Sequence, residues 1–215
     1  MDPRVKKHID LLVKRYPELV SAIEDIERTF QVLKECYEGD HKLLVAGNGG
    51  SAADSEHIVG ELMKRFKLPR PVLPDFEKKL KTINPLKGEQ LAYNLERGLM
   101  SIALVAHEGL STAYLNDVDG EGIFAQQVYG YGRKGDVFWG ISTSGNSKNV
   151  LNAAIVAKAL DMKVIGLTGR NGGELEKVAD VTIKVPENET YMIQELHLPV
   201  YHCLCLMLEE YFFGN

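Results

Sequence analysis

A threefold repeat constrains the fold of this chain more than any other feature of its sequence. A short apolar run, a turn rich in Gly, Ser and Asn, and then a helix follow one another from residues 43, 136 and 163. Continuous apolar runs are typical of strands that are buried on both faces of a parallel sheet. The strand–turn–helix order favours right-handed crossovers, which place helices on both faces. The sequence therefore predicts an α/β fold with a doubly wound, mostly parallel sheet flanked by helices.

Helical patterns occupy both ends of the chain. Residues 1–40 are predicted as an N-terminal helical segment, in which Pro17 begins the second of two helices. An apolar stripe at helical spacing runs through this segment, formed by Leu19, Ile23, Ile26, Phe30 and Leu33. The stripe packs either on the chain's own sheet or on its copy in another subunit. Residues 181–185 are predicted as the last strand, and residues 190–212 as a long C-terminal helix.

Residues 67–98 are the part of the chain least typical of regular structure. Three prolines between residues 69 and 74 are expected to break any helix, and a charged stretch follows them. We predict one short helix over residues 89–97 and a return to strand over residues 99–106. The segment is therefore expected to be a surface insertion, or a lid over the site, within a single domain that spans residues 1–215.

Composition limits the class of protein. The chain has 215 residues, 45% of them hydrophobic, which suffices for one sizeable core. A formal net charge of −5 gives no support for nucleic acid as a partner, and no apolar run approaches the roughly 18 residues of a membrane span. The three cysteines form no CxxC pair, which is typical of buried thiols in a reducing compartment. Since the N-terminus lacks a signal-peptide pattern, we expect a soluble cytoplasmic protein.

The first strand–turn–helix unit, residues 42–66, carries one candidate site. Its turn exposes backbone N–H groups and a hydroxyl at a helix N-terminus, where partial positive charge favours an anion. His57 and Glu61 follow at i, i+4 spacing, which puts both on one face of the helix. They are either an ordinary surface pair or a titratable pair that meets a bound ligand.

The second turn, residues 142–147, is predicted to hold a phosphate group. The spacing from Gly140 to Ser147 is that of a P-loop, but Asn146 stands where that motif requires Lys, so an NTPase is not expected. The first turn fits a dinucleotide fingerprint, yet lacks the acidic residue that should follow about 20 residues later. Hydroxyls with free N–H groups suit a phosphate monoester, whereas capping a helix would use only one residue. The predicted phosphate-binding residues are Ser142, Thr143, Ser144 and Ser147.

The C-terminal helix carries polar groups in an apolar context, namely Gln194, His197 and His202. Buried polar groups need partners, so these three side chains are not all expected to be idle core residues. Taken singly, His197 is predicted to be a core histidine with satisfied hydrogen bonds.

Five motifs in this order resemble those of the sugar isomerase (SIS) domain family, specifically its phosphoheptose isomerase branch. They are GNGGS, HxxxE, ND, STSGNS and QExHxxxxH, and they cover most of residues 42–212. The resemblance implies a phosphorylated sugar as substrate and a homotetramer with active sites at subunit boundaries. It also implies that the 142–147 hydroxyls hold the phosphate. The residues implied for binding the sugar are Asn48, Gly49, Gly50, Ser51, Asn116, Asp117 and Gln194.

The same resemblance implies the catalytic groups and a metal. Glu61 would be the general base and His202 the acid/base partner that interconvert a ketose and an aldose through an enediol. Zinc is implied at His57, Glu61, Gln194 and His202, where it would polarise the carbonyl. On a straight helix Gln194 and His202 would lie about 12 Å apart. A single ion would then require a kink at Pro199, a Gln194 that precedes the first full turn, or ligands from neighbouring subunits.

The expected function is conversion of sedoheptulose 7-phosphate into D-glycero-D-manno-heptose 7-phosphate. Two alternatives remain: a non-catalytic phosphosugar-binding scaffold, such as a replication-initiator-associated regulator, and an isomerase of another phosphosugar. A scaffold has no need of Glu61 and His202 together. The chain departs from the branch in the longer segment 74–98, and at His107 and Tyr191, where Asp occurs in the branch. These departures bear on the substrate rather than on the fold.

Overall fold

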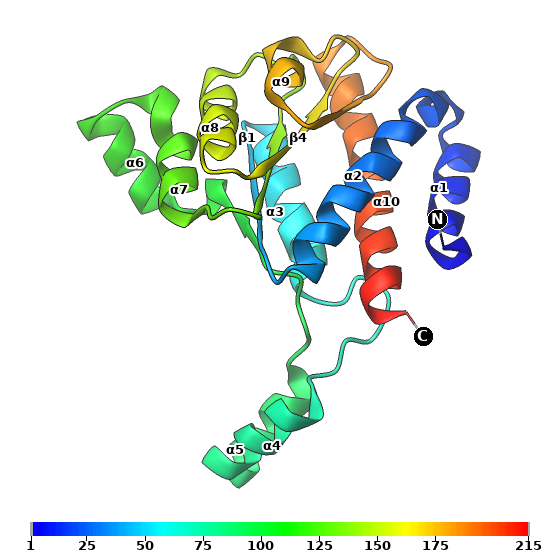
Figure 1. The fold of residues 1–215 in the computed structure, drawn as a ribbon, viewed down its shortest axis with the longest axis vertical. Helices are drawn as coiled ribbons and strands as arrows, with labels where there is room; N and C mark the ends of the chain where they lie inside the picture. The colour runs from blue at the N-terminus through cyan, green and yellow to red at the C-terminus, as the bar shows by residue number, and fades with distance from the viewer. Residues whose placement is uncertain (1, 215) are drawn as a thin grey trace.

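The computed structural model describes residues 2–214 and has a five-stranded parallel sheet at its centre (Figure 1). The strand order is β2-β1-β3-β4-β5, and all four neighbouring pairs are parallel. The strands are β1 (Leu43–Gly47), β2 (Ser101–Ala103), β3 (Val137–Ile141), β4 (Lys163–Thr168) and β5 (Val181–Lys184). The predicted doubly wound α/β fold is confirmed.

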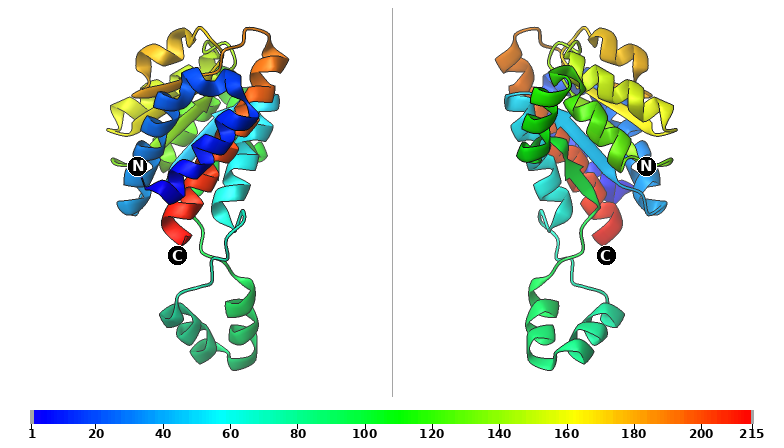
Figure 2. Two further views of the ribbon diagram at one scale, coloured as in Figure 1. Left: turned by 90° about the vertical axis from the view of Figure 1, so that its right-hand side faces the viewer. Right: turned by 90° about the vertical axis from the view of Figure 1, so that its left-hand side faces the viewer.

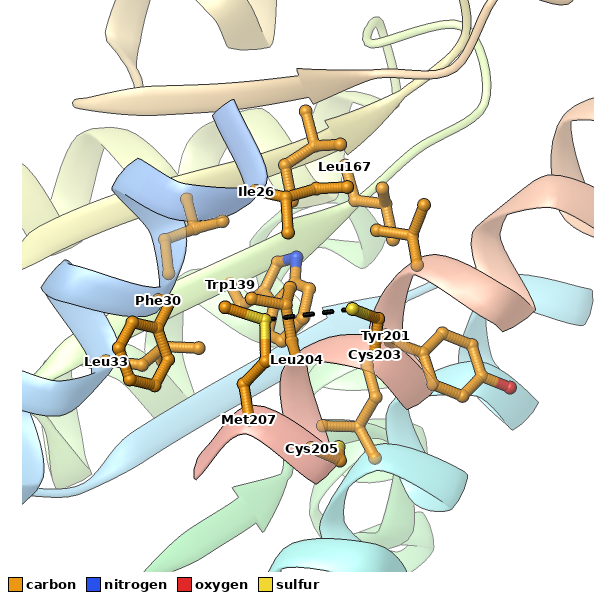
Figure 3. Close-up of a cluster of buried hydrophobic side chains, with 14 of the residues drawn as sticks. Ile26, Phe30, Leu33, Trp139, Leu167, Tyr201, Cys203, Leu204, Cys205 and Met207 are labelled. Carbon is orange, nitrogen blue, oxygen red and sulfur yellow. Dashed lines mark hydrogen bonds between the residues drawn. The ribbon is translucent and has the colours of Figure 1, made fainter. Parts of the chain in front are cut away.

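Helices cover both faces of this sheet and divide the core in two. One face is covered by α2 (Ile23–Glu38), α3 (Gly50–Met63) and α10 (Thr190–Phe213). The other face is covered by α7 (Ile123–Tyr131), α8 (Lys148–Ala159) and α9 (Gly173–Val178). Because side chains alternate along a strand, Trp139 of β3 belongs to the first core and its neighbour Phe138 to the second. Figure 3 shows Trp139 among side chains of α2 and α10.

The N-terminal helices bury the predicted apolar stripe within the chain itself. A 3₁₀ helix, η1 (Pro17–Ala22), joins α1 (Pro3–Arg15) to α2, and α1 packs against α10. The stripe residues that are at most 2% exposed are Leu19, Ile26, Phe30 and Leu33. They belong to the core that contains Trp139. Packing on the chain's own sheet, rather than on another copy, therefore accounts for the stripe.

A helical hairpin between α3 and β2 projects from the body of the molecule (Figure 2). Its helices are α4 (Pro74–Ile83) and α5 (Pro85–Asn94). The prediction of one short helix over residues 89–97 is confirmed only in part, because α5 covers residues 85–94 and α4 precedes it. Because proline is favoured at the first helical position, Pro74 and Pro85 begin helices instead of breaking them. The hairpin follows the end of α3 and extends from the edge of the sheet where β1 begins (Figure 1).

The chain after the hairpin follows the prediction more closely. The strand expected over residues 99–106 is short, since β2 has three residues and the 3₁₀ helix η2 (Leu104–Ala106) follows it. Next come α6 (Glu108–Asp117) and η3 (Gly120–Gly122). The strands predicted from residues 136, 163 and 181 and the helix from residue 190 are confirmed. All three cysteines are free and buried, as expected. Among the described residues, no helix combines the length and the apolar character that crossing a membrane requires.

Candidate active site

The candidate site begins where the strand order reverses, between β1 and β3. The turns after these two parallel neighbours emerge side by side at the carboxyl edge of the sheet. In open α/β sheets, ligands bind at this position. Asn48 in the first turn and Asn149 on α8 exchange two amide hydrogen bonds, 2.8 and 2.9 Å long. The structure thus brings together the two turns that the sequence singled out.

The first turn leaves room for a ligand beside its backbone. Gly49 has a φ of +57°, a conformation that favours glycine, and nothing lies within 4 Å of the place a Cβ would occupy. A Cβ on Gly50 would lie 2.7 Å from the side-chain nitrogen of Gln194. Ser51 is buried in the first turn of α3. The start of α3 is therefore open at Gly49 and bordered by the Gln194 amide.

The second turn keeps its hydroxyls free of helix capping. Ser147 directly precedes α8 but makes no side-chain capping bond, and its hydroxyl instead lies 2.9 Å from that of Ser142. Ser144 Oγ accepts a hydrogen bond of 3.1 Å from the Asn146 N–H, within the turn. Thr143 and Ser147 are half-buried, and Ser144 is exposed. Asn149 Oδ1 accepts from the Val150 N–H at 3.0 Å, but Ser147 does not cap α8, so the N–H groups before Val150 suit a bound phosphate.

Three titratable side chains meet between α3 and α10, and we call them the His–Glu–His cluster (His57, Glu61 and His202). His57 Nε2 lies 3.3 Å from Glu61 Oε1 on the same helix and 3.4 Å from His202 Nε2. Lys64 Nζ lies 3.1 Å from the other carboxylate oxygen of Glu61. The Glu61 side chain is 14% exposed and that of His57 is 42% exposed. The cluster is therefore partly shielded from water yet open to a ligand.

The packing of α3 against α10 decides where Gln194 lies. Gln194 is beside Gly50 near the start of both helices, and His202 is beside His57 further along both. Gln194 already lies inside α10, so it does not precede the first turn. Eight residues of helix separate it from His202, a rise of about 12 Å. A single chain therefore does not bring Gln194 to the His–Glu–His cluster.

Burial and neighbouring charge shift the pKa values of His202 in this cluster and of Asp54 beside it. Burial, followed by the charge that His57 can carry, lowers the pKa of His202, while the Glu61 carboxylate acts in the opposite direction. Burial also raises the pKa of the Asp54 carboxyl. A neutral imidazole at His202 is suited to exchanging a proton with a substrate oxygen near neutral pH.

His197 differs from its prediction. The residue is fully buried on α10, but neither ring nitrogen has a hydrogen-bond partner among residues 2–214. Burial lowers the pKa of His197 to about 4, and the nearby Thr168 backbone acts in the opposite direction. His197 is therefore a neutral core residue rather than a satisfied one.

The cluster fits zinc in ligand type and in pairwise spacing. Two ligand atoms of one tetrahedral zinc lie about 3.4 Å apart, because Zn–N and Zn–O bonds are about 2.0–2.2 Å long. The separations of 3.3 and 3.4 Å from His57 Nε2 match this value. Within residues 2–214, no group of three or more His, Cys, Asp or Glu side chains is arranged to hold a metal ion. The cluster would thus have to close around an ion to bind it.

Two predicted sugar-binding residues lie on α6, which belongs to neither turn nor to the His–Glu–His cluster. Asn116 and Asp117 are exposed at the end of α6, where the Asn116 amide donates to Asp117 Oδ1 at 2.8 Å. Within the described part of the chain, α6 packs on α7 and η3, and no hydrogen bond or ion pair joins these two residues to either turn or to the cluster. Within residues 2–214, direct hydrogen bonds therefore do not join these two residues to the other predicted ones.

Sequence reasoning missed the side chains that contact His57 at Nδ1, the ring nitrogen that does not face Glu61 and His202. The Tyr201 hydroxyl donates to Asp54 Oδ1 at 3.1 Å, and its oxygen lies 3.0 Å from His57 Nδ1. Asp54 could have been found, because a residue three positions before His57 lies on the same helix face. Tyr201 reaches His57 only through the packing of α10 on α3.

Sequence reasoning also missed a buried ion pair that contacts the end of α3, next to Glu61. Arg70 Nη2 lies 2.9 Å from Glu209 Oε1, and neither side chain is more than 1% exposed. The guanidinium also donates to the carbonyl oxygens of Leu62 and Glu61, at 2.7 and 3.2 Å. It thereby helps to satisfy carbonyl groups at the end of α3, where the Leu62 carbonyl oxygen also accepts from the Leu99 N–H at 2.9 Å. The pair joins α3, α10 and the chain that leads to the hairpin.

Comparison with known proteins decides the family. The SIS domain model matches residues 14–93 and 91–169 of this chain. A phosphoheptose isomerase from Sulfurimonas denitrificans is 38% identical over 218 residues, which cover 98% of each chain. The phosphoheptose isomerase structure from Neisseria gonorrhoeae has 33% identity and a TM-score of 0.70, and the match covers 94% of this chain and 96% of that one. The chain belongs to the phosphoheptose isomerases of the SIS domain family.

A second solved structure agrees with this placement. The phosphoheptose isomerase from Francisella tularensis is 29% identical, with a TM-score of 0.71 and coverage of 94% of this chain and 98% of that chain. In this chain the Glu61 carboxylate contacts His57, which in turn contacts His202, and a carboxylate and an imidazole are side chains that can serve as general acids and bases.

Proposed function

We propose that this chain is an aldose–ketose isomerase that converts sedoheptulose 7-phosphate into D-glycero-D-manno-heptose 7-phosphate. The observation that carries the proposal is the series of contacts from Glu61 to His57 and from His57 to His202, within a fold whose switch point presents a hydroxyl-lined turn. A scaffold that only bound a phosphosugar would need the turn, but not a carboxylate in contact with imidazoles. The similarity to named phosphoheptose isomerases supports the same reaction.

The reaction moves one proton between two carbons and another between two oxygens. In our proposal, Glu61 removes a proton from C1 of the ketose and returns it to C2, through a cis-enediol. His202 passes the second proton between the oxygens. A well-placed acid or base contributes on the order of 10²- to 10⁴-fold, or roughly 3–5 kcal/mol of barrier.

The substrate-binding roles follow the positions of the two turns. We propose that the phosphate is held by Ser142, Thr143, Ser144 and Ser147, at the N-terminus of α8. We propose that the sugar is bound by Asn48, Gly49, Gly50, Ser51, Asn116, Asp117 and Gln194. The open space beside Gly49 and the Gln194 amide next to Gly50 support the first-turn part of this assignment.

Zinc is proposed as the metal of the cluster. His57, Glu61 and His202 would hold it, since their ligand types and the two measured separations fit. Gln194 would join them only from another copy of the chain, because its own α10 places it about 12 Å from His202. When bound, zinc would polarise the substrate carbonyl and stabilise the developing oxyanion.

We propose a homo-oligomer, with a tetramer as the expected form. Two observations support it: within residues 2–214 no hydrogen bond or ion pair joins Asn116 and Asp117 to the rest of the site, and the hairpin exposes large apolar side chains. Those that are at least 45% exposed are Phe76, Ile83, Leu86, Leu91 and Tyr93. Ten-residue helices are marginal without packing partners, so a second copy that covers the hairpin would stabilise it. Light scattering should give a multiple of the 24.0 kDa chain mass, and a monomer at micromolar concentration would contradict the proposal. The cytoplasmic location expected from the sequence stays a prediction.

The test of function is an isomerase assay with a matched pair of proteins. Wild-type protein with sedoheptulose 7-phosphate should form the aldose, whereas Glu61→Gln should lose at least about 10²-fold in turnover because the base is gone. The same variant should bind the ketose phosphate within about tenfold of wild type, since the amide keeps the shape of the carboxylate. Wild-type binding without turnover would favour the scaffold, and turnover of a different ketose phosphate would favour another substrate.

A further inference from the structure

Tyr201, which contacts His57 at Nδ1, has a hydroxyl that the proposed reaction does not use. Figure 3 shows the Tyr201 ring at the edge of the buried cluster of side chains, with its hydroxyl pointing away from that cluster. The residue is 1% exposed. Its hydroxyl oxygen lies 3.1 Å from Asp54 Oδ1 and 3.0 Å from His57 Nδ1. Two polar partners therefore share one buried hydroxyl.

Counting protons assigns a direction to these two hydrogen bonds. A tyrosine hydroxyl has one proton to donate, and an ionised carboxylate can only accept. The Tyr201 proton therefore goes to Asp54 Oδ1, which lies 3.1 Å from the hydroxyl oxygen. The oxygen of Tyr201 is then left to accept, so the short contact with His57 requires a proton on His57 Nδ1.

This assignment determines what the other side of the His57 ring presents. A neutral imidazole protonated at Nδ1 carries a lone pair at Nε2. The Nε2 atom lies 3.3 Å from Glu61 Oε1 and 3.4 Å from His202 Nε2. With two acceptor atoms facing each other, His57 and Glu61 form no hydrogen bond of their own, and a cation between them is favoured.

We propose that Tyr201, held by Asp54, is a positioning residue that keeps the proton of His57 on Nδ1 and leaves Nε2 free to bind a divalent metal ion beside Glu61. The inference deepens the proposed function, because it gives the His–Glu–His cluster a fixed tautomer before any ligand arrives. Residues that fix the tautomer of a ligating histidine typically change metal affinity by about 10- to 100-fold when they are removed.

The tautomer is tested directly in the metal-free, full-length protein. With ¹⁵N-labelled histidine, two-dimensional NMR distinguishes a ring protonated at Nδ1 from one protonated at Nε2. We expect His57 of the wild type to be protonated at Nδ1. In Tyr201→Phe that proton loses its acceptor, so the ring should shift to the Nε2–H form, which can donate to Glu61. A wild-type His57 protonated at Nε2, or an unchanged ring in the variant, would overturn the proposal.

The matched control is Tyr211→Phe on the same helix. Its hydroxyl donates to Glu38 at 2.5 Å, far from the cluster, so the tautomer of His57 should not change. Zinc titration provides the second measurement. Tyr201→Phe should weaken zinc binding about 10- to 100-fold, and Tyr211→Phe should not weaken it. Equal zinc affinity in all three proteins would contradict the positioning role.

The two proposals fail in distinguishable ways. If the wild type binds no zinc, the metal in the proposed function is refuted, while the NMR spectrum still decides the role of Tyr201. If Tyr201→Phe is too unstable to study, the wild-type spectrum alone tests the Nδ1 assignment.

Discussion

Removing the carboxylate of the buried Arg70–Glu209 pair should destabilise the protein strongly. In Glu209→Ala the Arg70 guanidinium, which is 1% exposed as a residue, keeps its charge but loses hydrogen bonds of 3.1 and 2.9 Å. The N–H groups of Phe66 and Lys67 lose their acceptor as well, but Phe66 is half-buried and Lys67 is exposed, so both can turn to water. The unpaired buried cation therefore dominates, and breaking such a pair costs about 3–5 kcal/mol.

The assay is urea unfolding at one fixed protein concentration, followed by circular dichroism. A matched control is Glu174→Ala, which removes an exposed ion pair with Lys177 and should cost less than about 1 kcal/mol. Replacing both partners, as in Arg70→Met with Glu209→Leu, should cost less than Glu209→Ala alone, because no buried charge remains. A loss below about 1 kcal/mol in Glu209→Ala would refute the reasoning.

Three further predictions concern the second turn and the core. Gly145→Ala should cost at least about 2 kcal/mol more than Gly49→Ala, because both glycines have positive φ but only a Cβ on Gly145 would meet the Gly172 carbonyl oxygen, at 1.9 Å; equal losses by urea unfolding would contradict this. Ser144→Ala should weaken binding of the phosphorylated sugar but not of the unphosphorylated sugar by calorimetry, and equal weakening of both would exclude a phosphate contact. His197 has a folded-state pKa near 4, below the unfolded value of about 6.5, so stability should fall by up to about 3 kcal/mol as the pH drops through that window. His197→Leu should flatten this part of the stability–pH curve, and an unchanged slope would show that another group is responsible.

The elements that the sequence predicted well are those set by local pattern. Buried parallel strands such as β3 give continuous apolar runs, and the turns that follow are marked by glycine, serine and asparagine. The hairpin was misread because proline has two meanings: inside a helix it breaks the hydrogen-bond ladder, but at the first position it begins one. Pro74 and Pro85 stand at first positions. Where a helix begins must therefore be known before a proline can be interpreted as starting it or breaking it.

From residue spacing, only those parts of the candidate site that lie on one helix could be predicted. His57 and Glu61 were placed together because four residues separate them on one helix. His202 required the packing of α10 on α3 across 145 residues, and the family resemblance rather than physical reasoning supplied it. Tyr201 and the Arg70–Glu209 pair were missed for the same reason, since nothing local in the sequence joins residues 139 positions apart. The spacing of about 12 Å between Gln194 and His202 was visible as a difficulty for the implied zinc set, because it depends only on the rise of one helix.

The most direct test of the central claim is isotope exchange in deuterated water with sedoheptulose 7-phosphate. If Glu61 removes the proton from C1 and returns one to C2 through an enediol, the aldose product should carry deuterium at C2, measured by mass spectrometry and NMR. Wild-type protein should give labelled product, and Glu61→Gln should give neither product nor label. Aldose formed by Glu61→Gln at the wild-type rate with deuterium at C2 would contradict the assignment of Glu61 as the base.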